Sequence, residues 1–272
     1  MKRNKGFTLI ELLVVIAIIA MLLSILMPSL GKAKKLAQNV ICKTRLRATG
    51  MYFNLYAIDN NGFTKQSGTG SGSQWKDIIK IYQLASNKKS NTYVCPTATK
   101  SLAEGATRPF HAWNKSPEKV LLGEPAVSYT LNRWIYGHPA GGSNGAMPYE
   151  SRWAKPEGAI GYADNAPLLA DGLNDSGYPK HTDDPLHYYD EHKQNPGQIT
   201  GNDMGTGNAG YMQNFTADRH PHAMINFVFL DWSTRGVRVR DLWKLKWHKD
   251  FELGFDPTFP DKDNTDIGYN ID

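Results

Sequence analysis

The sequence of 272 residues is short of cysteine, of net charge and of catalytic signatures. Only two cysteines are present, which excludes a disulfide-rich scaffold. The formal net charge of +5 falls to +2 when the cations Lys2, Arg3 and Lys5 are removed, so nucleic-acid binding is not expected. The chain contains no repeat of fixed period, no nucleophile motif and no glycine-rich phosphate loop. It also lacks a second apolar run long enough to cross a membrane.

One long apolar run is present, close to the N-terminus. Residues Leu9 to Met27 include only two polar side chains, Glu11 and Ser24. As a helix this run spans about 28 Å, which is enough to cross a bilayer core of about 30 Å. A secretory signal carries its small-residue cleavage site after the apolar stretch, but here the small residue, Gly6, precedes it. Cleavage after Gly6 would leave the helix on the mature chain, so the segment is predicted to be an anchor.

Glu11 is unusual because an unpaired carboxylate inside a membrane helix costs on the order of 3 kcal/mol. Cleavage after Gly6 would create a partner, the new α-amino group of Phe7, on the same chain or on a neighbouring one. The alternative is that Glu11 lies at the level of the lipid headgroups and is solvated there.

The stretch Gly-Phe-Thr-Leu-Ile-Glu followed by an apolar helix resembles the prepilin signature of type IV pilins and type II secretion pseudopilins. The resemblance covers roughly the first 60 residues. It implies that a prepilin peptidase cleaves between Gly6 and Phe7 and methylates the new amine of Phe7. Glu11 matches the glutamate that guides docking of subunits into a filament, and Pro28 matches a helix-breaking proline of such chains.

The resemblance therefore predicts a non-enzymatic structural subunit of a secretion or pilus-like filament. Its expected partners are prepilin peptidase, copies of itself, other pilin-like subunits, and an inner-membrane assembly platform with its ATPase. The expected location is the bacterial inner membrane, crossed once, with the head in the periplasm or on a filament. The alternative is a membrane-anchored binding module that holds a glycan or another ligand through aromatic-rich loops (Trp113, Trp134, Trp153, Tyr188 and Tyr189).

The N-terminal helix is predicted to continue beyond the membrane, bent or locally opened near Pro28. Apolar or small residues recur in steps of three and four and mark one helical face. Asp59-Asn60-Asn61-Gly62 supplies a stop signal. The predicted inner face consists of Ala33, Ala37, Val40/Ile41, Thr44, Ala48, Met51/Tyr52, Leu55 and Ile58.

The predicted organisation has four parts: a leader (1–6), a transmembrane or filament-core helix (7–30), an amphipathic helix (31–60) and an exported globular head (61–272). Within the head, a short helix is expected at 75–85, and strands at 126–136, 159–163, 224–230 and 236–240. The fold class is therefore α+β and pilin-like, with one long N-terminal helix packed on an antiparallel-sheet head that has long loops.

The two cysteines allow two interpretations. In an oxidising compartment, Cys42 and Cys95 would form one disulfide, which would close a loop of about 50 residues and stabilise the head by about 3–4 kcal/mol. This bridge would join the helix to the head. The alternative is a pair of independent buried thiols.

The last two predicted strands carry a second resemblance. His220, His222, Asn226 and Asp231 resemble the prepilin-type processing-associated motif, in which a histidine, nine residues and Asp-Gly follow one another. The histidines stand eleven and nine positions before Asp231, and Trp232 replaces the glycine. An aspartate at a hairpin turn is also explained by turn chemistry.

Metal binding is not expected. A His-x-His pair with carboxylates such as Asp171 could hold a metal, but its spacing matches no known zinc pattern. The acidic tail residues Asp261, Asp263 and Asp266 loosely resemble a calcium loop, yet their spacing differs from that of an EF-hand. The sequence thus predicts no cofactor, with calcium as a minor alternative.

Overall fold

The computed structural model describes an N-terminal helix and the central sheet of the head. The described residues are 8–60, 92–98, 127–135, 161–173, 176–181, 212–215, 219–222 and 224–253, together with the single residues Ile78, Lys100, Phe110, Ala112, Ala159 and Asp183.

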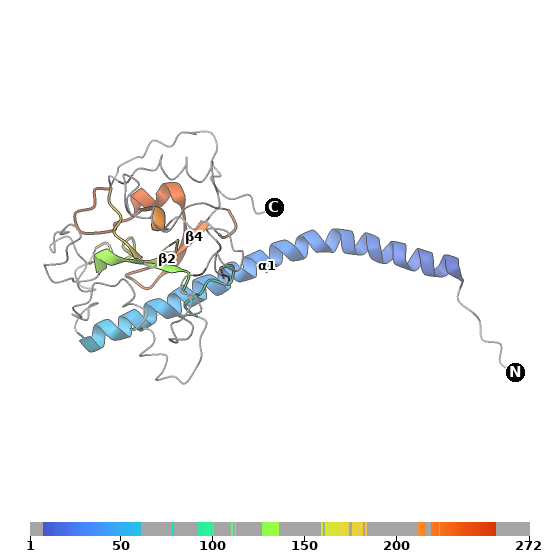
Figure 1. Ribbon diagram of the computed structural model, residues 1–272, viewed down its shortest axis with the longest axis horizontal. Helices are drawn as coiled ribbons and strands as arrows, with labels where there is room; N and C mark the ends of the chain where they lie inside the picture. Colours follow the sequence, from blue (N-terminus) through green and yellow to red (C-terminus); the bar gives the residue numbers. More distant parts are fainter. Residues whose placement is uncertain are drawn as a thin grey trace.

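The helix α1 (Leu9–Asn60) is one continuous element of 52 residues, about 78 Å long. Its N-terminal half projects from the head as a curved arm, and its C-terminal half lies along the sheet (Figure 1). Pro28 lies inside the helix without interrupting it, so the arm is bent and is not opened there. α1 is also long and apolar enough to cross a membrane, by length and composition.

The head contains a five-stranded sheet with the order β3-β1-β2-β4-β5. The strands are β1 (Tyr129–Asn132), β2 (Pro167–Asp171), β3 (Ser176–Gly177), β4 (Met224–Phe229) and β5 (Thr234–Arg238). All pairs are antiparallel except β1 and β3, which run parallel, so the sheet is mixed. Three short 3-10 helices complete the described elements: η2 (Arg133–Ile135), η5 (Met212–Phe215) and η6 (Val239–Lys244).

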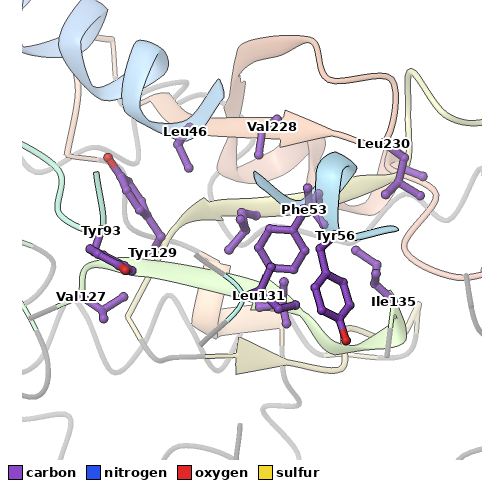
Figure 2. Close-up of a cluster of buried hydrophobic side chains, with 14 of the residues drawn as sticks. Leu46, Phe53, Tyr56, Tyr93, Val127, Tyr129, Leu131, Ile135, Val228 and Leu230 are labelled. Atoms are coloured by element: carbon purple, nitrogen blue, oxygen red, sulfur yellow. The ribbon is translucent and has the colours of Figure 1, made fainter. Parts of the chain in front are cut away.

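The sheet separates two hydrophobic cores. On one face, Leu46 and Phe53 of α1 pack with Leu131 of β1 and Val228 of β4 (Figure 2). On the other face, the strand residues Phe227 and Phe229 pack with an aromatic group that includes Phe215, Trp243 and Trp247. Alternate side chains of β4 enter opposite cores, as the period of two in a strand requires. The α+β, pilin-like fold class is thereby confirmed.

The predicted inner face of α1 is mostly wrong, although Tyr52, one of its residues, does pack against the core. The residues buried against the head are Cys42, Leu46, Thr49, Gly50, Phe53, Tyr56 and Ala57. The apolar residues expected there face outward instead: Val40, Met51, Leu55 and Ile58 keep between 47% and 70% of their surface exposed. The buried face includes small and polar residues, which a count of apolar positions undervalues.

The strand predictions are partly correct. The hairpin of β4 and β5 is confirmed, although β5 begins at Thr234, two residues before the predicted start. The strand expected at 126–136 is shorter and turns into η2 at Arg133. The strand expected at 159–163 is wrong: residues 161–165 form a turn, and the strand β2 follows it. The helix expected at 75–85 lies outside the described residues, apart from Ile78, which is helical.

Candidate functional site

The first candidate site is the start of α1, where Thr8 and Glu11 cap the helix. The Glu11 carboxylate accepts hydrogen bonds from the backbone N–H of Thr8 at 2.8 Å and from its hydroxyl at 2.8 Å. In return, the backbone N–H of Glu11 donates to the Thr8 hydroxyl at 3.3 Å. This reciprocal pattern is a capping box, which satisfies donors that the first helical turn leaves unpaired. Glu11 therefore has a local structural role that the sequence prediction did not include.

The arm that follows is exposed along its length. Every residue from Thr8 to Lys34 is exposed, and none of the apolar side chains among Leu9 to Leu30 is buried by the residues that the structure describes. A continuous exposed apolar surface along this part of the helix is unusual for a soluble monomer, because apolar patches on such proteins rarely exceed several hundred Å². The arm is therefore suited to lipid or to the helices of neighbouring subunits.

The second candidate site is a buried polar cluster between α1 and the sheet. It consists of Cys42 from α1, Cys95 from the segment 92–98, Asp171 at the end of β2, and His220 before β4. All four residues are buried, and one ligand-type atom of each lies within 4.8 Å of the others. We call these residues the buried cluster.

The contacts inside the buried cluster are direct. Nε2 of His220 lies 2.9 Å from Oδ2 of Asp171. The Cys42 thiol donates to both carboxylate oxygens of Asp171, at 3.4 and 3.5 Å. Sγ of Cys95 lies 3.5 Å from Nε2 of His220. The four side chains thus form a continuous set of polar contacts in a site without solvent access.

Neighbouring groups orient the cluster. The backbone N–H of Asn226 donates to Oδ2 of Asp171 at 3.1 Å. The buried guanidinium of Arg219 lies 4.0 Å from the Asp171 carboxylate, and it donates to the carbonyl oxygens of Gly172 and Ser128. In the pairing of β1 with β2, Tyr129 lies opposite Asp171. This register places the Asp171 carboxylate beneath α1. The fold therefore holds Asp171 in place from several sides.

The electrostatics follow from this geometry. Burial alone would raise the pKa of Asp171, but His220 and Arg219 hold it below its usual value. Burial lowers the pKa of His220, yet the Asp171 charge and their hydrogen bond raise it to about 9. Burial disfavours the Cys95 thiolate, but hydrogen bonds from Cys42 and His220 lower the Cys95 pKa to about 6. For Cys42, burial raises the pKa well above its usual value.

The two cysteines predicted to form a disulfide do lie together, and both are free thiols in the structure. The bridge between Cys42 and Cys95 stays a prediction. The disulfide prediction paired these two residues and did not include Asp171 or His220. No local pattern joins the four, since they come from segments far apart in the chain.

The structure distinguishes the two histidines of the processing-associated motif. His220 is buried in the cluster, whereas His222 is exposed. Asp231 lies in the turn between β4 and β5, where its carboxylate accepts a hydrogen bond from the Ser233 N–H at 2.9 Å. Trp232 takes the left-handed conformation with φ 66°, which explains why the related motif has glycine there. Turn chemistry thus accounts for Asp231.

The remaining predicted site residues are placed as follows. The N–H of the Asn226 side chain donates to Asn39 of α1 at 2.8 Å, which links the motif to the helix. Trp134, an aromatic of the proposed ligand-binding loops, is buried, and its indole N–H donates to the Pro179 carbonyl. Outside the described residues lie Gly6, Phe7, the other loop aromatics (Trp113, Trp153, Tyr188 and Tyr189) and the acidic residues Asp261, Asp263 and Asp266.

Comparisons with known proteins concern the N-terminal part of the chain. Residues 1–27 match the prokaryotic N-terminal methylation motif. The chain is 47% identical over 64 residues to the type IV wide pilus major component PilA4 of Thermus thermophilus. That match covers 24% of this chain and 49% of the relative, so the chain spans about half the length of the curated relative it matches. No solved structure matches the chain.

These matches confirm the prepilin-type character of the N-terminal segment. They agree with the structure, in which the matched motif includes the capped start of α1 and its exposed apolar arm. The large head lies mostly beyond the matched residues.

Proposed function

We propose that this protein is a non-enzymatic structural subunit of a pilus or pseudopilus filament, assembled through the arm of α1. The observation that supports this proposal is the exposed apolar arm, which begins with a prepilin-type methylation motif. Prepilin peptidase cleaves after Gly6 and methylates Phe7. The subunit then waits in the inner membrane, crossing it once, until a platform and its ATPase add it to the filament.

The outward face of α1 supports assembly along the rest of the helix. Leu36, Val40, Met51, Leu55 and Ile58 are each between 47% and 70% exposed and follow one another at helical spacing. They continue the apolar surface of the arm past the point where the opposite face is buried by the head. Neighbouring helices in a filament would cover both surfaces and remove this apolar area from water.

Glu11 supplies the polar contact that sets the register of assembly. Its carboxylate already accepts two hydrogen bonds from Thr8 and retains capacity for a further donor. A methylated amine of Phe7 from a neighbouring subunit is such a donor. In a helix bundle of low dielectric, this charged contact is worth more than in water, and removing one partner leaves the other buried and unpaired.

The test separates the charge of Glu11 from its capping role. Glu11→Gln keeps a side chain that can complete the capping box but removes the charge, whereas Thr8→Ala weakens the cap and keeps the charge. Each variant is co-expressed with the wild-type protein, and the ratio of the two in sheared filaments is measured by mass spectrometry. Intact mass of the membrane fraction verifies cleavage after Gly6 in both variants.

We expect Glu11→Gln to enter filaments at least tenfold less well than wild type, because a hydrogen bond to a charged group contributes about 1.5–3 kcal/mol. Thr8→Ala should lose less than tenfold, since a cap contributes about 1 kcal/mol. Equal incorporation of Glu11→Gln and wild type would refute the assembly role. An equal loss in both variants would assign Glu11 to capping alone.

A further inference from the structure

We propose that Cys42, Cys95, Asp171 and His220 form a structural zinc site that fastens α1 to the head. The proposal goes beyond filament assembly and does not depend on it. It starts from the observation that four side chains of zinc-ligand type, all buried, place one ligand atom each within 4.8 Å of one another. Structural zinc sites are closed and tetrahedral, with four protein ligands drawn from cysteine, histidine and carboxylates.

Three distances inside the buried cluster are close to those of a tetrahedral site, and the widest separation among the four ligand atoms, up to 4.8 Å, must shorten by about 1 Å when an ion binds. With Zn–S of about 2.3 Å and Zn–N or Zn–O of about 2.0 Å, a sulfur should lie about 3.5 Å from a nitrogen or oxygen ligand. Sγ of Cys42 lies 3.5 Å from Oδ2 of Asp171, the oxygen that also contacts His220, and Sγ of Cys95 lies 3.5 Å from Nε2 of His220. The distance of 2.9 Å between Nε2 of His220 and Oδ2 of Asp171 must increase by a few tenths of an ångström, because nitrogen and oxygen ligands of one zinc ion are about 3.3 Å apart.

Charge balance also fits a divalent cation. Two thiolates and one carboxylate carry three negative charges, and burying them without compensation is very costly. A zinc ion and the Arg219 guanidinium, 4.0 Å from Asp171, cancel these charges when His220 is neutral. On binding, zinc takes the place of the thiol protons and of any proton on Nε2 of His220, and those protons leave to solvent.

Further contacts would orient the ligands. The Asn226 backbone N–H holds the Asp171 carboxylate at 3.1 Å, and the Thr97 hydroxyl lies 3.0 Å from Sγ of Cys95. The Tyr129 hydroxyl lies 3.6 Å from Sγ of Cys42. Such outer contacts fix ligand geometry in metal sites.

Zinc accounts for the buried cluster better than the other candidates. Calcium prefers six or more oxygen ligands, whereas two thiolates and an imidazole favour zinc. A disulfide would use only Cys42 and Cys95. It would leave Asp171 and His220 buried without the thiol contacts that they now make. Only a metal uses all four side chains at once.

The first measurement uses the full-length protein in detergent, isolated without reductant and then exposed to zinc alone. After dialysis, we expect close to one zinc per chain by elemental analysis and two free thiols by non-reducing intact mass. Cobalt in place of zinc should give tetrahedral d–d bands and a thiolate-to-cobalt charge-transfer band. A strong chelator should lower the thermal midpoint of the head, and added zinc should restore it.

Matched variants locate the site. His220→Asn should lose most of the bound zinc, whereas His222→Asn, two positions away and exposed, should retain it. Cys95→Ser should remove most of the charge-transfer intensity. If a variant does not fold, the cobalt spectrum of the wild-type protein still shows whether thiolates bind the metal. A Cys42–Cys95 disulfide in the isolated protein, absence of retained zinc, a cobalt spectrum without thiolate bands, or equal zinc retention by a folded His220→Asn would each overturn the proposal.

Discussion

The orientation of α1 on the head can be tested with Phe53→Ala. Phe53 is fully buried in the core between α1 and the sheet, where it lies among the labelled side chains of Figure 2. Replacement by alanine removes the ring and leaves a cavity that the packed neighbours fill only in part. A buried Phe→Ala change costs about 3–5 kcal/mol. This is a large share of the 5–15 kcal/mol that stabilises a typical domain.

The matched control is Leu55→Ala, two positions along the same helix and 47% exposed. It should change the free energy of unfolding by less than about 1 kcal/mol, since little packing is lost and alanine favours the helix. The assay is urea unfolding of the full chain in detergent, followed by tryptophan fluorescence. With an m-value of about 2–3 kcal/mol/M, Phe53→Ala should lower the midpoint by about 1–2 M.

The two variants distinguish the observed face of α1 from the one predicted by apolar periodicity. If the predicted face contacted the head, Leu55→Ala would cost more than Phe53→Ala. That order of midpoints, or equal midpoints for the two variants, would refute the packing of Phe53 against the sheet.

Two further predictions concern the head. Gly50→Ala should destabilise it by about 1 kcal/mol net, because its Cβ would lie 2.8 Å from Cγ2 of Val228 and overpacking outweighs the gain in helix propensity. Val228→Ala should relieve this clash in the double mutant, which urea midpoints would show, and additive effects would contradict it. Burial lowers the pKa of His248 from 6.5 to about 4 in the folded protein. As the pH falls below 6.5, His248 is therefore protonated in the unfolded chain before it is protonated in the folded one. Stability should therefore decrease between pH 6.5 and 4, and His248→Phe should flatten this dependence in thermal melts; an unchanged pH profile would contradict the assignment.

The features predicted correctly from sequence are those set by local chemistry. The apolar arm, the continuous helix and the β4–β5 hairpin follow from composition and from periodicities within one segment. The capping box of Thr8 and Glu11 was also readable, since Thr and Glu stand three positions apart before an apolar run. The resemblance to prepilins assigns Glu11 to filament docking, and the cap is a second, local role of the same carboxylate.

The features predicted wrongly depend on contacts between distant segments. Both faces of the second half of α1 carry apolar residues, and Thr49 and Gly50 give the buried face little hydrophobic signal. Periodicity alone therefore could not decide which face meets the head. The buried cluster depends on the register that places Asp171 opposite Tyr129, and a strand was predicted at 159–163, where residues 161–165 form a turn. Because β2 was not predicted, the position of Asp171 relative to the two cysteines could not be predicted either.

The position of the buried cluster connects the two proposals. Cys42 is the first fully buried residue of α1, so it lies where the arm leaves the head. Glu11 is about 46 Å from Cys42 along a helix of this rise. A tilt of about 10° at Cys42 would displace Glu11 by about 8 Å, more than the few ångströms over which a charged hydrogen bond acts. A metal link between α1 and three segments of the head would limit that tilt. The zinc site would thus fix the angle between the head and α1. That angle in turn determines how neighbouring subunits are positioned relative to one another in the filament.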